Sequence, residues 1–262
     1  MITSTSNAKV KYLVNLKKKR KERDRENVFL VEGIRMFREV PADKLKEVYV
    51  SESFYKKERS LVDEVAGRGR VRVEVLADNV FSHVSDTITP QGVLCVVEQM
   101  NYSLEQVLSN GKIPHLMVLD NLQDPGNLGT IVRTSEGAGV TGIVMSKETV
   151  DIYNPKVIRS TMGSIYRMPF YYAEDLLKAI EEMKKRNIST YAAHLEGKHA
   201  YDEEDYKKAC AFFIGNEGNG LRDEVAKAAD IYIRIPMCGQ VESLNAAIAA
   251  SVLMFEAARQ RR

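Results

Sequence analysis

Residues 120–129 read Asp120-Asn121-Leu122-Gln123-Asp124-Pro125-Gly126-Asn127-Leu128-Gly129, directly after the short apolar run Leu116–Leu119. That run has the length and composition of a buried strand, and the spacing of apolar residues over Leu128–Ala138 predicts a helix. Glycine lets the backbone approach a ligand closely, while asparagine side chains both donate and accept hydrogen bonds. The stretch therefore predicts a strand, a ligand-binding loop and a helix in succession.

Two more loops of similar composition follow apolar runs nearer the C-terminus. They read Gly215-Asn216-Glu217-Gly218-Asn219-Gly220 and Ile235-Pro236-Met237-Cys238-Gly239-Gln240-Val241-Glu242-Ser243-Leu244-Asn245. In an open α/β sheet the loops at the carboxyl ends of the strands meet at one edge, where ligands bind. One such loop is more simply read as a tight turn, but three at one edge predict a binding site.

Short apolar strands alternate with helices throughout residues 116–262, which predicts a mostly parallel sheet covered on both faces. The expected strands are Leu116–Leu119, Gly142–Ser146, Ser189–His194, Ala211–Gly215 and Ile231–Ile235. Helices are expected between them, and a long final helix is expected over Ser243–Arg259.

A separate run of strand and helix signals fills residues 1–98 and is long enough for a small α/β domain. Its expected strands are Val28–Val31, Lys46–Ser51, Val71–Leu76 and Gly92–Glu98, and its expected helices are Asn7–Arg25, Gly33–Val40, Glu52–Ala66 and Asp78–Val84. The polar stretch Gln99–His115 predicts a linker that buries little. We therefore expect a first domain over 1–98, a linker over 99–115 and a second domain over 116–262.

The charge of the chain is concentrated at its start. The 262 residues carry a net charge of only +2, but residues 1–26 hold nine basic and three acidic residues, a net charge of +6. The basic run Lys17–Arg25 is either a solvated helix face or a contact for phosphates, which lysine and arginine neutralise. The cations Lys17, Lys18, Lys19, Arg20 and Lys21 are the candidate contacts for the phosphates of a nucleic acid.

Composition and spacing exclude several classes of protein. The chain is 44% hydrophobic and 28% charged, which is typical of a globular protein, and no apolar run is long enough to span a membrane. The polar start Met1–Lys9 does not resemble a signal peptide, and three distant cysteines form no disulfide framework, so we expect a cytoplasmic protein. The four histidines form no metal motif, so no metal is expected, and there is no phosphate-binding P-loop.

All three loops resemble the motifs of one family. Asp120–Val140 resembles the first motif of the SpoU (TrmH-type) branch of the SPOUT RNA methyltransferases, Phe213–Leu221 the second and Ile235–Ala246 the third. Residues 1–98 resemble the RNA substrate-binding domain often found ahead of this catalytic domain. The stretches Phe29–Gly33 and Gln91–Val97 carry this second resemblance, and they are less specific than the three loop motifs.

The resemblance implies an α/β fold in which the C-terminal chain forms a trefoil knot that binds S-adenosylmethionine (AdoMet), working as a homodimer. It implies methylation of a ribose 2′-hydroxyl, and the additional N-terminal domain favours ribosomal RNA ahead of transfer RNA. AdoMet carries an activated methyl group, so the difficulty of the reaction lies in removing the proton of a weakly acidic hydroxyl.

Residue roles follow from the resemblance, position by position. The implied catalytic residues are Arg133, Asn127, Glu217, Ser243 and Asn245. Arg133 would clamp the target phosphate and stabilise the developing alkoxide, since arginine is a poor base. Asn127 would order the first loop, and Glu217 would accept hydrogen bonds from backbone amides or from Asn245. The implied cofactor contacts are Gly215, Ile235 and Leu244, with Leu195, Gly197 and Met237 beside them.

Two other functions stay open on the residues alone. One is a non-catalytic RNA-binding or ribosome-assembly factor on the same fold. The presence of all five implied catalytic residues argues against it. The other is a nicotinamide-dependent dehydrogenase, but Gly215, Gly218 and Gly220 do not have the spacing of its glycine fingerprint.

Overall fold

Two groups of elements pack around separate cores in the computed structural model, which describes residues 1–262. Unit 1 contains residues 1–100 and 151–166, and unit 2 contains residues 101–150 and 167–262. Residues 151–166 therefore pack with the N-terminal elements, although the chain on both sides of them belongs to unit 2.

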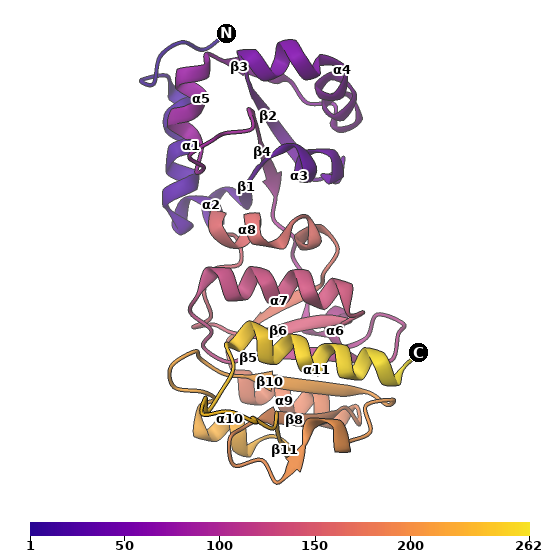
Figure 1. Ribbon diagram of the computed structural model, residues 1–262. Helices are drawn as coiled ribbons and strands as arrows, with labels where there is room; N and C mark the ends of the chain where they lie inside the picture. The colour runs from indigo at the N-terminus through magenta and orange to yellow at the C-terminus, as the bar shows by residue number, and fades with distance from the viewer. The chain divides into compact units, whose positions relative to one another are not determined.

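Unit 1 is built on a mixed four-stranded sheet with the strand order β1-β4-β2-β3. The pairs β1–β4 and β2–β4 are antiparallel, and the pair β2–β3 is parallel. Helices α1 and α5 cover one face of the sheet, and α3 and α4 cover the other (Figure 1). The strands are β1 (Val28–Glu32), β2 (Leu45–Ser51), β3 (Val73–Leu76) and β4 (Val93–Glu98); the helices are α1 (Ala8–Lys18), α2 (Arg20–Glu26), α3 (Ile34–Glu39), α4 (Glu52–Gly69), α5 (Asp78–Val84), α8 (Pro155–Thr161) and the 3₁₀ turn η1 (Ser164–Tyr166).

The expected single helix over residues 7–25 is divided into α1 and α2 at Lys19, whose backbone is extended (φ −120°, ψ 113°). Arg23 explains the break. Its buried guanidinium donates to the carbonyl of Leu16 (2.7 Å), near the end of α1, and to Asp151 (2.5 Å). Because the carbonyls at the C-terminal end of a helix have no helical partner, an arginine returning from α2 satisfies them.

Unit 2 is built on a seven-stranded sheet with the strand order β7-β6-β5-β10-β8-β11-β9. Every neighbouring pair in it is parallel, which confirms the predicted sheet type. From β5 the chain continues outward through β6 and β7, and β10 on the other side of β5 belongs to the second half of the sheet. The junction of β5 and β10 is therefore the topological switch point, where such sheets bind ligands.

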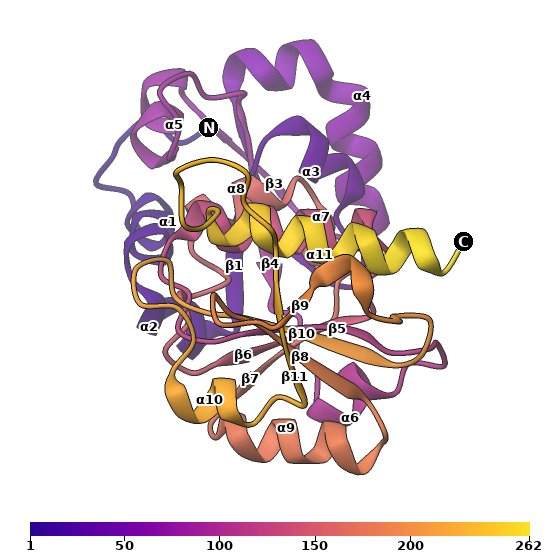
Figure 2. The same ribbon diagram turned by 60° about the horizontal axis from the view of Figure 1, so that its bottom comes forward.

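Helices cover both faces of this sheet, as predicted. Helices α7 and α11 pack against each other on one face, and α6, α9 and α10 lie on the other (Figure 2). The strands are β5 (His115–Leu119), β6 (Gly142–Ser146), β7 (Phe170–Ala173), β8 (Ser189–Ala193), β9 (His199–Ala200), β10 (Cys210–Ile214) and β11 (Ile231–Arg234); the helices are α6 (Leu104–Leu108), α7 (Pro125–Gly137), α9 (Leu176–Lys185), η2 (Tyr201–Glu203), α10 (Asp223–Lys227) and α11 (Ala246–Gln260).

The stretch 99–115 does not have the low burial expected of it. It contains α6, in which Val107 and Leu108 are buried in the core of unit 2. A Cβ added to Gly142 would lie 2.6 Å from the Val107 side chain, so the glycine at the start of β6 makes room for α6. The sequence pattern does not reveal this short apolar helix, because most residues of the stretch around it are polar. Ser103 is the N-cap of α6.

Candidate active site

The loops after β5 and β10 are joined at the switch point of the sheet. The backbone N–H of Asp120 donates to the carbonyl of Ile214 (2.9 Å), so the parallel pairing of the strands extends one residue into the loops. The Asn216 side chain then donates to the carbonyl of Asn121 (2.9 Å). Two of the three loops predicted to meet at one edge are therefore in direct contact.

The loop 215–222 is a closed, narrow turn. Asn216 and Gly220 exchange two backbone hydrogen bonds of 2.9 Å, and the Asn216 Oδ1 accepts from the N–H groups of Gly218 (2.9 Å) and Asn219 (3.1 Å). A Cβ on Gly215 would lie 2.1–2.3 Å from the backbone of Gly220 and Leu221. No larger residue fits there, because a Cβ cannot approach backbone atoms so closely.

Glu217 extends from this turn to the start of α7. Its carboxylate accepts from the backbone N–H of Gln123 (3.1 Å) and Asp124 (2.9 Å), and from the side chain of Asn127 (3.0 Å). Burial acts to raise the pKa of Glu217, but these donors outweigh it and lower the pKa. Glu217 therefore accepts from backbone amides of the first loop, as expected, although its side-chain donor is Asn127 and not Asn245.

Asn127 links the first and third loops. It lies in the first turn of α7, where Asp124 caps the helix by accepting from the Asn127 N–H (2.8 Å). Its Oδ1 accepts from the side chain of Asn245 (3.0 Å). The structure places the Asn127 side chain between two partners, Glu217 and Asn245, and its expected role in ordering the first loop stays a prediction.

The last helix begins three residues later than expected. Asn245 is the N-cap of α11, because its Oδ1 accepts from the N–H groups of Ala247 (2.9 Å) and Ile248 (3.3 Å). Ser243 thus lies in the loop before the helix, where it is exposed and forms no hydrogen bond. Its hydroxyl is free to contact a ligand, which a capping hydroxyl would not be.

Arg133 lies on α7, six residues after Asn127, and its side chain is exposed. It forms no hydrogen bond or ion pair with any residue of the chain. Arg133 is therefore not part of a surface salt bridge on α7. A free, exposed guanidinium is suited to bind an anion such as a phosphate.

The candidate cofactor residues follow the carboxyl ends of β8, β10 and β11. A Cβ on Gly197 would lie 2.6 Å from the backbone of Ile233, so Gly197, like Gly215, allows two chain segments to cross closely. The apolar side chain of Leu195 is 67% exposed, and those of Ile235, Met237 and Leu244 are half-buried. Partly exposed apolar side chains beside such crossings are the surface expected to hold an aromatic base.

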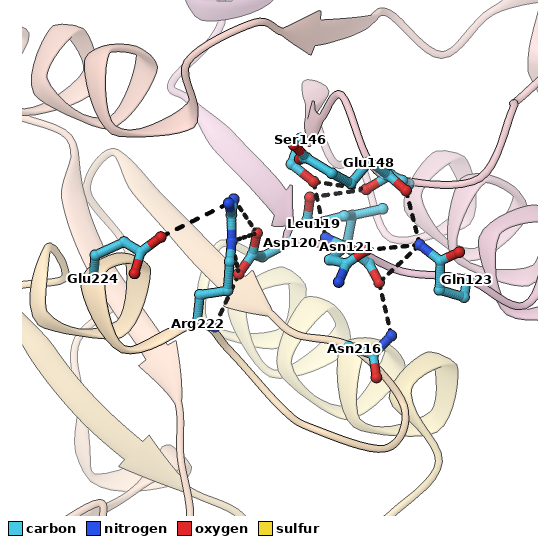
Figure 3. A network of polar contacts seen from close by, with 10 residues as sticks. Leu119, Asp120, Asn121, Gln123, Ser146, Glu148, Asn216, Arg222 and Glu224 are labelled. Atoms are coloured by element: carbon cyan, nitrogen blue, oxygen red, sulfur yellow. Dashed lines mark hydrogen bonds and ion pairs between the residues drawn. The ribbon is translucent and has the colours of Figure 1, made fainter.

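Asp120 and Arg222 are functional candidates that the sequence patterns did not reveal. The two side chains form an ion pair beside the hydrogen bonds of Asn121, Gln123 and Asn216 (Figure 3). Asp120 is fully buried. The sequence does contain one signal for this pair: Asp120 directly follows a buried strand. An unpaired carboxylate there would destabilise the fold, so a basic partner could have been expected.

The basic run in unit 1 divides into engaged and free cations. Lys17 is half-buried and donates to the carbonyl of Ser85 (2.8 Å), and Arg20 pairs with Asp24 (3.4 Å). By contrast, Lys18, Lys19 and Lys21 are exposed and have no partner. Two of the five candidate RNA contacts therefore serve the fold as well.

Two further findings concern metal ions and membranes. No group of three or more histidine, cysteine, aspartate and glutamate side chains is placed to hold a metal ion. None of the helices combines the length and the apolar character that crossing a bilayer requires.

Comparison with known proteins shows the family of this chain. Residues 114–255 match the SpoU rRNA Methylase family, and residues 7–95 match the MRM3-like substrate binding domain. The first match covers more than half of the chain, so the chain belongs to the SpoU rRNA methylase family. The three loops at the switch point all lie within the matched region.

Individual relatives match almost the full length. The 23S rRNA (guanosine(2553)-2′-O)-methyltransferase RlmP of Bacillus subtilis is 32% identical over 97% of each chain. A crystal structure of an AdoMet-bound rRNA methyltransferase from Sinorhizobium meliloti matches with a TM-score of 0.83 and 31% identity, covering 98% of this chain and 97% of that one. The AdoMet complex of the SpoU methyltransferase AviRb from Streptomyces viridochromogenes matches with a TM-score of 0.87 and 25% identity, covering 97% and 98%.

Proposed function

We propose that this chain is an AdoMet-dependent RNA methyltransferase that modifies a ribose 2′-hydroxyl of ribosomal RNA. The observation that carries the proposal is the linked set Glu217–Asn127–Asn245 at the switch point. Asn127, the middle residue of the set, lies on the helix α7, which also bears the unpaired Arg133. Membership of the SpoU rRNA methylase family supports the same reaction.

Ribosomal RNA is proposed ahead of transfer RNA as the substrate, with the cytoplasm as the place of action. The relative RlmP, which matches 97% of this chain, is named for a guanosine of 23S rRNA, and this makes a 23S rRNA guanosine the first candidate to test.

AdoMet fits the residues at this edge of the sheet. Gly215 and Gly197 let two chain segments cross closely at this edge, because a Cβ at either position would meet backbone. The partly exposed Leu195, Ile235, Met237 and Leu244 provide apolar surface for an adenine ring. When bound, AdoMet supplies the activated methyl group of a sulfonium. The chain has to hold the acceptor hydroxyl in line with that group and assist the loss of its proton.

Arg133 is the proposed catalytic group. Its guanidinium stays charged at neutral pH and has no partner in the chain, so it is free to clamp the phosphate next to the target ribose. In that position it also stabilises the alkoxide that develops as the hydroxyl loses its proton. Ser243 and Asn245 are proposed to lie beside the ribose, and Glu217 and Asn127 to hold the loops that surround it.

Unit 1 is proposed to bind the RNA substrate through residues 1–98, and unit 2, which includes α6 of the stretch 99–115, is proposed to be the methyltransferase domain. The match of residues 7–95 to a substrate-binding domain supports this assignment. The exposed, unpaired Lys18, Lys19 and Lys21 are its candidate phosphate contacts.

A trefoil knot in the C-terminal chain and a homodimer complete the proposal. Family membership supports both. The crossings at Gly197 and Gly215 are compatible with a tightly threaded chain. Helix α11 leaves Ile248 and Phe255 about half exposed on a face that does not pack on α7, and a second copy would cover it.

The reaction is tested with radiolabelled AdoMet and ribosomal RNA from cells that lack this gene, followed by nucleoside analysis. A labelled 2′-O-methyl nucleoside is the expected product. Base methylation, or labelling of transfer RNA alone, would contradict the proposed substrate. If neither AdoMet binding nor label is detected, the non-catalytic RNA-binding factor becomes the better account.

A further inference from the structure

The buried carboxylate of Asp120 receives all of its hydrogen bonds from one residue, Arg222. Asp120 has no exposed surface, and every donor to its carboxylate belongs to Arg222: the backbone N–H (3.0 Å), Nε (2.9 Å) and Nη2 (2.6 Å) (Figure 3). A buried carboxylate is stable only where such donors replace water. Arg222 is therefore held in place by both its backbone and its guanidinium.

This pair fixes one end of the loop that carries Glu217. Arg222 is the last residue of the loop 215–222 and the N-cap of α10. The other end is fixed by Asn216, which donates to the carbonyl of Asn121 (2.9 Å). The two ends of the loop are thus attached to two successive residues, Asp120 and Asn121, at the carboxyl end of β5.

Between these attachments the loop behaves as one body. The paired backbone groups of Asn216 and Gly220 close it, and Gly215 packs directly against Gly220 and Leu221. Glu217 lies between these attachments. From there it reaches the N–H groups of Gln123 and Asp124 and the side chain of Asn127.

We propose that Asp120 and Arg222 are positioning residues of the AdoMet and ribose site, which act through Glu217 on the first loop and Asn127. They do not touch the substrate in this proposal. The inference rests on the proposed function for its catalytic readout, but the positioning itself is a property of the protein without ligand. An ion pair that served only to stabilise the fold would not be coupled to Glu217.

The first test is amide hydrogen–deuterium exchange of the full-length protein without AdoMet. Arg222→Gln is expected to accelerate exchange by about tenfold or more in residues 121–127 and 216–221, because the loop loses one attachment. The matched control is Arg186→Gln, which breaks the guanidinium–carboxylate pair with Glu105 elsewhere in unit 2. Unchanged exchange in Arg222→Gln, or the same acceleration in both variants, would overturn the inference.

The second test is a double-mutant cycle between Arg222→Gln and Glu217→Gln, read out as AdoMet affinity and single-turnover methyl transfer. Each single variant is expected to lose about 10- to 100-fold in transfer, since small misplacements at a reacting centre are this costly. The double variant is expected to be no worse than the poorer single variant. Fully additive losses would show independent roles and overturn the inference.

Folding and function are separated by two controls. If Arg222→Gln does not fold, Arg222→Lys keeps the charge but loses the two-pronged contact, and it is expected to show the same changes to a smaller degree. If the wild-type protein neither binds AdoMet nor transfers a methyl group, the proposed function fails, while the exchange experiment still decides whether the pair positions the loops.

Discussion

The side chain of Asn245, the residue that caps α11, donates to the Oδ1 of Asn127 (3.0 Å) at the start of α7. This contact fixes which way the Asn127 amide faces. Because its oxygen is taken by Asn245, its nitrogen points to Glu217, to which it donates (3.0 Å). The amide of asparagine carries its acceptor and its donor on two different atoms, so it contacts Asn245 with one and Glu217 with the other.

Asn127→Asp tests this joint with a side chain of the same shape. A carboxylate at residue 127 still accepts from Asn245 but faces the carboxylate of Glu217, and the repulsion should open the first loop. We expect kcat/KM for methyl transfer to fall by at least about tenfold at pH 8, which corresponds to about 1.4 kcal/mol.

The loss should be pH-dependent. Two carboxylates that share a site raise one pKa, so protonation of one of them at lower pH restores a donor between residues 127 and 217. Transfer by Asn127→Asp relative to wild type is therefore expected to improve from pH 8 to pH 6. A ratio that stays constant with pH would argue against direct contact between the two side chains.

Arg133→Ala is expected to abolish methyl transfer while AdoMet binds with nearly unchanged affinity. The guanidinium has no partner in the chain, so its removal should not disturb the fold, and the loss of a group that stabilises developing charge costs about 100-fold or more. Single-turnover transfer and calorimetric titration with AdoMet measure the two effects separately. Full turnover by the variant would remove Arg133 from the proposed mechanism.

Patterns within the sequence predicted the elements of the fold well wherever local chemistry decides them. Strand β6 and helix α5 have the predicted bounds, and the three loops follow strands as expected. The pattern did not predict contacts between distant residues. Arg23 divides the first helix through a pair with Asp151, 128 residues away, and no local signal marks such a partner.

The candidate site shows the same limit. Ser243 and Asn245 are both residue types that cap helices, and the local sequence does not decide between them. The choice is made by Asn127, which holds Asn245 at the end of the loop. Arg222 resembled a surface arginine in the sequence, and its role depends on the loop that brings it to the buried Asp120.

Gly215→Ala should damage the cofactor site much more than Gly218→Ala, three residues later in the same loop. The added methyl group meets the backbone of Gly220 at 2.1 Å in the first case, whereas in the second its nearest neighbour is the Asn216 side chain at 3.6 Å. We expect AdoMet affinity to fall about 100-fold or more for Gly215→Ala and to stay near wild type for Gly218→Ala. Equal affinities would show that the crossing at Gly215 relaxes without cost.

Neutralising Lys18, Lys19 and Lys21 together is expected to weaken RNA binding and to flatten its dependence on salt. For every phosphate that the variant no longer neutralises, the slope of log K against log salt should become shallower by roughly 0.7–0.9. Arg25→Gln is the matched control, because that cation already pairs with Glu22 and Glu26. If the triple variant and wild type show equal salt slopes, the basic run Lys17–Arg25 is a solvated helix face and not a phosphate contact.

His115 should make the protein sensitive to moderate acid. It begins β5, is almost fully buried, and its Nε2 has no hydrogen-bond partner. Burial, and then the positive charge of Arg261, lower the pKa of His115 from 6.5 to about 4, while a backbone hydrogen bond with Gly139 opposes this. The folded protein thus holds His115 neutral at pH values at which the unfolded chain binds a proton.

The contribution of His115 to stability is therefore complete above pH 6.5 and is lost progressively as the pH falls towards 4. The loss is on the order of 3 kcal/mol over that range. His115→Phe keeps a ring beside Phe212 but removes the titration, so urea unfolding of both proteins at several pH values isolates the effect from that of the carboxylates. The stability of the variant relative to wild type should rise as the pH falls from 6.5 to 4. A difference that does not change with pH would mean that His115 has the same pKa in the folded and the unfolded protein.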